Sequence, residues 1–308
     1  MDTYKFQVED EWEGIRIDKF LSGNLDFLSR SYLQKMIQEQ RVTVNGKTVK
    51  ANYMLRPDEE VEFHLPESVE PEILPQEIPL EVLYEDEDVI VVNKPKGMVV
   101  HPAPGHYSGT LVNALLAHCK DSLSGINGVM RPGIVHRIDK DTTGSLIACK
   151  NDLAHESIAA QLKEHSILRR YRAICMGVLK EEEYRIDAPI GRHPAERKRM
   201  AVNQRNGKPA VTRVRVLERL KNATYIECQL ENGRTHQIRV HLSSLGHPLL
   251  GDEVYGDSKN RFKLQGQTLH AFILGFHHPK DGHYVETVAP LPEYFMALLT
   301  RLRENHGE

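Results

Sequence analysis

Residues 133–149 carry a cluster of polar side chains that could do chemistry. Asp139 follows an apolar run and stands beside three basic or titratable residues: His136, Arg137 and Lys140. A second apolar run starts at Leu146, and two apolar runs around a polar turn with glycine predict strand, loop, strand. We expect a carboxylate on such a loop, among cations, to stay ionised and point outward. A nucleophile or a general base requires that state.

This stretch closely resembles the central motif of the pseudouridine synthases that act on large-subunit ribosomal RNA, His-Arg-Leu-Asp followed by a Thr-x-Gly turn. The motif here reads His136-Arg137-Ile138-Asp139, with Ile at the Leu position. The resemblance implies that Asp139 is the catalytic residue and that Arg137 fills the place in the RNA that the target uridine leaves. A lone Asp would be interpreted as a turn or cap residue. The complete motif favours catalysis.

Three further motifs match the same family. In the first, residues 168–173, the resemblance implies that Tyr171 stacks on the target base. The second, residues 231–241, is the longest, and the family pairs one of its arginines with the catalytic Asp. A helix N-terminus with two arginines can hold a carboxylate and also bind phosphate. By the match of Ile238-Arg239 to the family motif, the resemblance assigns the pairing role to Arg239 and gives Arg234 second place. The third, residues 246–252, is expected to support the wall of the site.

The resemblance implies an isomerisation that breaks the N1–C1′ bond of uridine and joins C5 to C1′. Nothing is oxidised and no group is carried in or out, so we expect no cofactor and no metal. The nucleotide-binding loops Gly-x-Gly-x-x-Gly and Gly-x₄-Gly-Lys-Ser/Thr are absent, and we expect the histidines, including His277 and His278, to lack ligand partners at useful spacing. Whether Asp139 attacks the sugar, attacks the base or removes a sugar proton stays open.

The residues before Pro66 predict a small unit of two helices and a small sheet. Helix faces recur at 17–21 and 33–37, with Ser29 or Ser31 as N-cap, and residues 42–49 and 61–65 have the pattern of a hairpin and a third strand. The unit resembles the S4 RNA-binding domain in residues 16–21, 29–34 and 42–46. The resemblance implies that cations of this unit face the RNA backbone, with Arg30 favoured among Arg16, Arg30, Lys35, Arg41 and Lys47.

The rest of the chain predicts an α+β fold. Residues 66–80 contain four prolines and four glutamates and are expected to form a stiff linker between an S4-like domain at 1–65 and a catalytic domain at 81–308. Strands are predicted at 89–92, 171–178, 211–217 and 224–230. Helices are predicted after an Asp152 cap and at 235–245, with Ile238, Leu242 and Leu245 inward. The resemblance implies the pseudouridine synthase fold, with a largely antiparallel mixed sheet.

The charge distribution suits a polyanion such as RNA. The net charge is −3, yet residues 192–221 carry ten Lys or Arg against two Glu, and residues 16–50 carry seven against three acids. The acidic stretch 57–88 separates them. We expect no membrane span and no secretory signal, and four dispersed cysteines predict buried free thiols in a reducing cytoplasm.

Other interpretations stay open. Residues 139–145 partly match the Asp-Lys-Thr-Gly-Thr signature of phosphotransferases with an aspartyl-phosphate, but one residue breaks the match. A non-catalytic RNA-binding factor for ribosome assembly would need the basic segments but not Asp139 with Tyr171 and Arg239. Within the family, large-subunit ribosomal RNA is the favoured substrate and transfer RNA the second choice. No obligate protein partner is implied, and the oligomeric state is open.

Overall fold

The computed structural model describes residues 2–66, 73–103, 106–120, 122–128, 131–196, 199–256 and 262–304. Its contacts divide the chain into two compact units, Met1–Glu70 and Pro71–Glu308, with the division inside the predicted linker. Residues 73–80 are part of the second unit, because Ile73 is buried in its core and the Leu74 carbonyl accepts a hydrogen bond from the Asn113 side chain. Among the described residues no helix is both long enough and apolar enough to cross a membrane.

The first unit packs two helices against a small antiparallel sheet. The helices are α1 (Ile17–Asn24) and α2 (Arg30–Gln38), and the sheet has the order β1 (Asp2–Gln7), β4 (Glu60–Leu65), β2 (Val42–Val44), β3 (Lys47–Thr48). The predicted apolar faces of both helices are buried, and the Ser29 side chain caps α2 by accepting a hydrogen bond from the Tyr32 amide. Strand β1 was not predicted, because its short alternating pattern leaves Tyr4 and Phe6 only half-buried on an edge strand.

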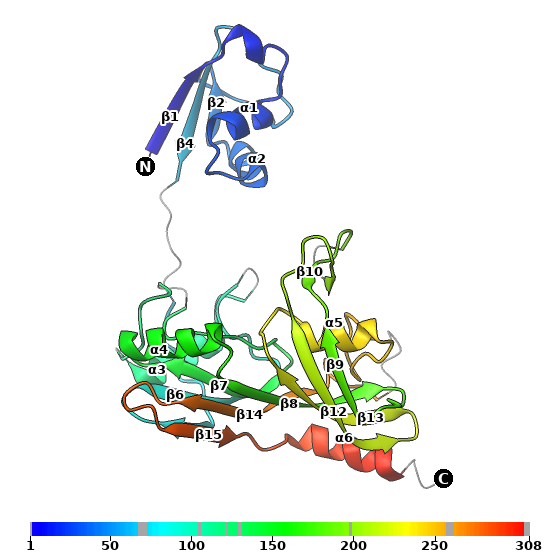
Figure 1. The fold of residues 1–308 in the computed structure, drawn as a ribbon. Coiled ribbons are helices and arrows are strands. Elements are labelled where there is room, and N and C mark those ends of the chain that lie inside the picture. Colours follow the sequence, from blue (N-terminus) through cyan, green and yellow to red (C-terminus); the bar gives the residue numbers. More distant parts are fainter. Residues whose placement is uncertain are drawn as a thin grey trace. The chain divides into compact units, whose positions relative to one another are not determined.

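The second unit is built on a large mixed sheet, which can be followed in Figure 1. Within the described ranges it has nine strands, in the order β5 (Val82–Glu85), β6 (Val89–Lys94), β7 (Thr143–Cys149), β14 (Leu269–His277), β8 (Leu168–Met176), β13 (Ala223–Leu230), β12 (Val211–Leu220) and β9 (Glu183–Asp187), with β15 (Tyr284–Val288) paired to β14. The ladder between β7 and β14 is parallel, and the other described ladders of this sheet are antiparallel. The predicted α+β class with a largely antiparallel sheet is confirmed.

Helices cover both faces of this sheet. Alternate residues of β6 and β7 pack on α3 (Leu111–Cys119) and on α4 (Asp152–Lys163), which therefore lie on opposite faces. The core under α3 also contains α5 (Gln237–Ser244), whereas α6 (Glu293–Glu304) packs on Ile174, Leu220 and Ala223 in a separate cluster. A small hairpin of β10 (Ile190–Arg192) and β11 (Met200–Val202) projects from the sheet (Figure 1).

Three local predictions are wrong. The first apolar run around residues 133–149 is not a strand, since Ile134 makes only an isolated bridge with Ala148. The N-cap of α4 is Asn151, because the carboxylate of Asp152 accepts a hydrogen bond from Ser124 instead. Leu245 is 42% exposed, because α5 ends at Ser244 and the chain then turns away. The prediction of buried free thiols is confirmed for all four cysteines.

Candidate active site

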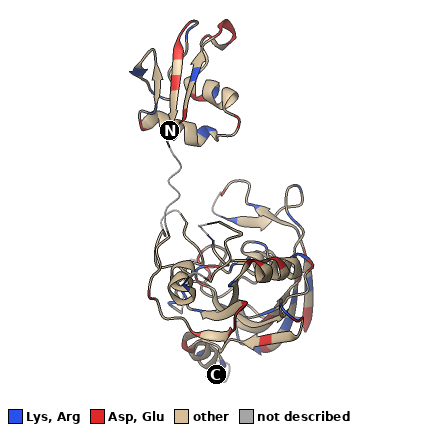
Figure 2. Cartoon of the chain, turned by 90° about the vertical axis from the view of Figure 1, so that its left-hand side faces the viewer, with Lys and Arg blue, Asp and Glu red and all other residues tan. Residues whose placement is uncertain are grey.

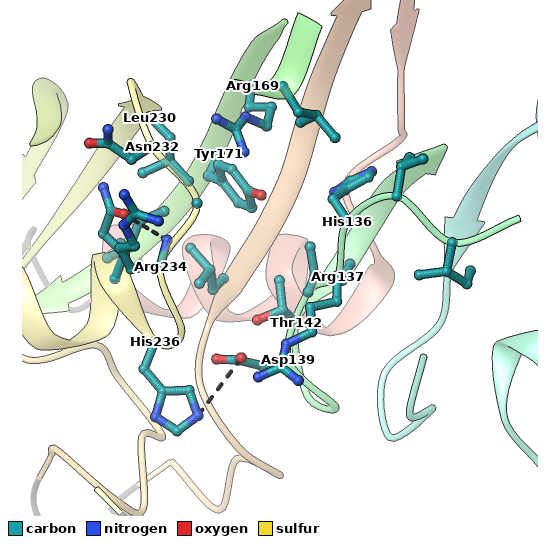
Figure 3. A pocket seen from close by; sticks show the side chains of 18 of the residues that line it. His136, Arg137, Asp139, Thr142, Arg169, Tyr171, Leu230, Asn232, Arg234 and His236 are labelled. Carbon is teal, nitrogen blue, oxygen red and sulfur yellow. Dashed lines mark hydrogen bonds and ion pairs between the residues drawn. The ribbon is translucent and has the colours of Figure 1, made fainter. Parts of the chain in front are cut away.

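Asp139 lies in a cleft of about 730 Å³ in the second unit. The walls come from the loop before β7, from β8, from the segment between β13 and α5, and from α5 itself (Figure 3). Asp139 is the single carboxylate among the described lining residues, which include six cations: Arg131, Arg137, Lys163, Arg169, Arg234 and Arg239. The cations of this cleft suit a large anionic ligand, and Asp139 is the carboxylate that such a ligand would meet there.

Arg239 on α5 joins Asp139 to a second, fully buried carboxylate. Its Nη1 donates to Oδ2 of Asp139 at 2.8 Å, and its Nε and Nη2 donate to the two oxygens of Asp252 at 2.7 and 2.9 Å. The Asp252 carboxylate also accepts hydrogen bonds from the amides of Val254 and Tyr255. The guanidinium is thus fixed from behind, and the nitrogen that faces Asp139 has little freedom to turn.

Arg239 and Asp252 remain charged although both are buried. Burial opposes ionisation of Asp252, but its hydrogen bonds and attraction to Arg239 outweigh that penalty and lower the pKa of its carboxyl. Burial likewise disfavours the charged guanidinium of Arg239, yet Asp252 and Asp139 together raise its pKa. Arg239 therefore presents a permanent positive charge to Asp139.

His236 approaches the other oxygen of Asp139. Its Nε2 lies 3.8 Å from Oδ1 of Asp139 (Figure 3), and its Nδ1 lies 2.8 Å from the Tyr255 hydroxyl. The Tyr255 hydroxyl already accepts a hydrogen bond from the Met200 amide, so its own proton is free for Nδ1 of His236. That arrangement favours the tautomer in which the Nε2–H of His236 faces Asp139.

The loop that carries Asp139 is anchored from behind by Lys94, a fully buried residue at the end of β6. Its ammonium donates to the carbonyls of Pro95, Met98 and Lys140 at 2.8 to 2.9 Å, and Lys140 directly follows Asp139. Burial lowers the pKa of Lys94 to about 7, although Asp141 and Asp139 oppose that shift. The same loop is fixed by His136, whose Nε2 accepts a hydrogen bond from the Ile147 amide, and burial lowers the pKa of His136 to about 3.

Tyr171 lies on β8 and is 7% exposed. Its ring borders the cleft between Arg169 and Asp139 (Figure 3). Burial raises the pKa of its hydroxyl, with Asp139 adding to this and Arg169 opposing it. The phenol is therefore neutral near pH 7 and offers an aromatic surface beside the reactive carboxylate.

The structure brings together all five site residues that the sequence predicted in the second unit. Asp139, Tyr171 and Arg239 line the same cleft with two RNA-binding candidates. Arg137 is exposed at the rim, where it donates to the Thr235 hydroxyl, and Arg234 donates to the Pro209 carbonyl. Of the two arginines considered as partner of Asp139, the structure pairs Arg239 with it.

Three of the five candidate RNA-binding cations of the first unit, Arg16, Arg30 and Lys35, have partners within that unit. Arg16 and Arg30 both donate to the buried carboxylate of Asp18, and Gln34 donates to it as well. Burial opposes ionisation of Asp18, but these hydrogen bonds outweigh it and lower its pKa. Lys35 is largely exposed and lies 3.6 Å from Glu39. Figure 2 shows that basic and acidic residues both occur along the backbone of this unit.

Sequence reasoning missed Asp252, His236 and Lys94 as parts of the site. His236 lies inside the motif at 231–241 and Lys94 follows the strand predicted at 89–92, but the sequence does not show which side chains turn toward Asp139 or its loop. Asp252 follows a glycine in a segment interpreted as wall packing. A buried acidic residue near an arginine-rich motif is the only signal that could have found it, and burial is not visible in the sequence.

The expectation that the histidines lack ligand partners is wrong for His278. On the turn between β14 and β15, its Nδ1 lies within 4.8 Å of ligand atoms of Asp281 and His283, and its Nε2 lies 2.7 Å from Asp86. His283 in turn pairs with Asp281. Hydrogen bonds within this group account for the arrangement, and its residues are not among those that line the cleft.

Comparisons with known proteins agree with this geometry. The family model RNA pseudouridylate synthase matches residues 88–244, and the S4 domain model matches residues 15–61. A Bacillus subtilis protein named an uncharacterized RNA pseudouridine synthase is 52% identical over 99% of this chain and 100% of its own length. The ribosomal large subunit pseudouridine synthase D of Zymomonas mobilis is 46% identical over 98% of each chain. The structure of human RNA pseudouridylate synthase domain containing 1 matches with a TM-score of 0.57 and 28% identity, over 78% of this chain and 98% of that one.

Proposed function

The chain belongs to the RNA pseudouridylate synthase family and carries an S4 domain, and we propose that it converts uridines of large-subunit ribosomal RNA to pseudouridine with Asp139 as the catalytic carboxylate. The observation that carries the catalytic assignment is the bond from Arg239 to Asp139 at the base of a cleft lined by cations. The fixed guanidinium binds Oδ2 of Asp139, and this bond leaves Oδ1 for the substrate.

The residues of the cleft divide the work of the reaction. The target uridine leaves its RNA stack, which costs a few kcal/mol, and Arg137 at the rim occupies the vacated place. The base stacks on Tyr171, which brings the sugar and C5 to Asp139. Asp139 attacks the sugar or the base, or removes a sugar proton, and the cleft geometry is compatible with each of these. The N1–C1′ bond breaks, the base turns, and C5 bonds to C1′. The C5 proton is lost and N1 takes up a proton, so the net change is an isomerisation.

The choice of ribosomal RNA rests on relatives that span the whole chain. Several of them, from Zymomonas mobilis, Pseudomonas aeruginosa and Nitrosomonas europaea, are named ribosomal large subunit pseudouridine synthase D, at 42–46% identity. Transfer RNA is the second candidate. Four buried free cysteines support a reducing compartment, the cytoplasm.

RNA binding by the first unit is proposed for Arg16, Arg30 and Lys35. The side chains of Arg16 and Arg30 stay 39% and 44% exposed although both hold Asp18, and Lys35 is 66% exposed. Asp18 sets the direction of the two guanidinium groups, which leaves nitrogen atoms for phosphate. Arg234 is proposed as a further phosphate contact at the cleft.

Tritium release from RNA labelled at C5 of uridine tests the catalytic assignment, because forming the C5–C1′ bond expels the C5 hydrogen. The RNA comes from cells that lack this gene, and the assay contains EDTA. We expect Asp139→Asn to abolish release while RNA binding stays nearly intact. Asp187→Asn removes an exposed carboxylate on β9 and serves as the charge control. Release by Asp139→Asn at the wild-type rate would refute the assignment.

A further inference from the structure

Arg169 is a buried cation without a counter-charge. It lies on β8 two residues before Tyr171, and it is 6% exposed. Among the residues that the structure describes, its guanidinium makes no hydrogen bond and no ion pair, and its Nε is buried without a partner. Arg239 in the same cleft is equally buried, but it donates three hydrogen bonds to two carboxylates.

This state is unfavourable for the free protein. Taking a charge out of water costs several kcal/mol unless a partner compensates, and a guanidinium does not avoid the cost by losing its proton. Burial lowers the pKa of Arg169, and Tyr171 only weakly opposes that shift. The one carboxylate among the described lining residues, Asp139, is already bonded to Arg239. The residues that the structure describes therefore leave Arg169 without a counter-charge, and a ligand in the cleft can supply it.

The surroundings of Arg169 are built to receive an anion. A Cβ on Gly233 would lie 2.7 Å from Nη1 of Arg169, so the main chain passes close to the guanidinium and a side chain at position 233 would push its tip aside. The neighbouring side chains of the cleft add donors or positive charge and no acid: Lys163, His165, Asn232 and Arg234. A planar guanidinium with free nitrogen atoms fits two oxygens of a phosphate group.

We propose that Arg169 binds a backbone phosphate of the substrate RNA at the inner end of the cleft. The proposal rests on the function proposed above. Arg169 and Tyr171 point to the same face of β8, about 7 Å apart along the strand, and Figure 3 shows them side by side. A nucleotide whose base stacks on Tyr171 therefore has its own or a neighbouring phosphate at Arg169. The RNA supplies the counter-charge that the protein lacks.

The test compares Arg169→Met with Arg170→Met. Arg170 is the next residue of β8, and its side chain lines a separate cavity on the opposite face with Arg213 and Arg215, so the two variants lose the same charge from one strand. Binding of an unmodified large-subunit ribosomal RNA transcript is measured between about 50 and 200 mM KCl. We expect Arg169→Met to weaken binding about 10-fold or more and to reduce the slope of log K against log salt by about 0.7 to 0.9, which corresponds to one phosphate. We expect Arg170→Met to leave the slope unchanged.

The melting temperature of the RNA-free protein supplies a second readout that a structural role would not produce. Because the charge of Arg169 has no partner in the free protein, Arg169→Met should melt at or above the wild-type temperature, and Arg169→Lys should restore most of the salt slope. A wild-type slope for Arg169→Met, or an equal loss for Arg170→Met, would overturn the proposal. Tritium release by wild type on the same transcript tests the proposed function separately, so the two failures are distinguishable.

Discussion

Replacing Arg239 by Met should leave the buried carboxylate of Asp252 without its counter-charge. The side chain of Asp252 has no exposed surface, and without Arg239 it keeps only the two amide donors of Val254 and Tyr255. Removing one partner of a buried pair typically costs about 3–5 kcal/mol, because the remaining charge is uncompensated. For a unit of the size of Pro71–Glu308 each kcal/mol lowers the melting temperature by about 2–4 °C, so the expected loss is on the order of 10 °C.

The double variant separates this electrostatic cost from lost packing. Asp252→Asn removes the negative charge but keeps an oxygen for the amide donors, so we expect it alone to cost about 1–3 kcal/mol. In the double variant Arg239→Met with Asp252→Asn, no buried charge is left at position 252. Its loss of stability should therefore be smaller than the sum of the single losses by about 1–3 kcal/mol.

Urea unfolding of the four proteins at pH 7, followed by far-ultraviolet circular dichroism, measures these differences. Trp12, the single tryptophan of the chain, lies in the first unit, so its fluorescence reports that unit separately and should not change. Tritium release should fall moderately in Asp252→Asn, where the bond from Arg239 to Asp139 can persist, and severely in Arg239→Met. Losses that add to within about 0.5 kcal/mol would refute the claim that Asp252 acts through Arg239.

Two further predictions concern Asp86, which stabilises the fold, and Lys94, which holds the loop of Asp139. Burial opposes ionisation of Asp86, but hydrogen bonds from Tyr84 and the main chain outweigh burial and lower the pKa of Asp86 to about 2. The ionised carboxylate therefore stabilises the fold above about pH 4, and this contribution is lost as the pH falls from 3.8 toward 2. Asp86→Asn should therefore cost about 2 kcal/mol at pH 7, and urea unfolding should show the gap to wild type closing below pH 4; a gap independent of pH would contradict this. Lys94→Met should leave three carbonyls without this donor and release the loop of Asp139, so tritium release should fall by about 10-fold or more. Unchanged release by a folded Lys94→Met protein would show that the loop holds its position without the ammonium.

Motifs predicted residues that the structure gathers in one cleft, because each motif keeps its residues within a few positions of one another. Asp139, Tyr171 and Arg239 come from three segments, and each segment was identified by its own letters before any of their contacts were known. The pairing of Arg239 rather than Arg234 with Asp139 was also predicted from the match. Their convergence depends on the order of strands in the sheet, which the letters do not specify.

Burial and pairing were the parts that the sequence could not supply. In the sequence, Asp18 counted only as one of three acids against seven cations at 16–50. In the structure Asp18 is buried and accepts hydrogen bonds from Arg16 and Arg30, so it fixes the positions of these two side chains. Leu245 has the correct spacing for a helix face, yet the helix ends one residue earlier and exposes it. The spacing of apolar residues predicts a buried helix face only as far as the helix itself extends.

The position of β14 has a consequence for synthesis of the protein. This strand comes late in the chain, yet it lies between β7 and β8 and joins the half of the sheet that carries Asp139 to the half that carries Tyr171 and Arg239. A nascent chain in which residues 269–277 have not yet been synthesised lacks the strand that brings these side chains together. The cleft can therefore assemble only after residues 269–277 have been synthesised, and a chain truncated before them has its motifs but no assembled cleft.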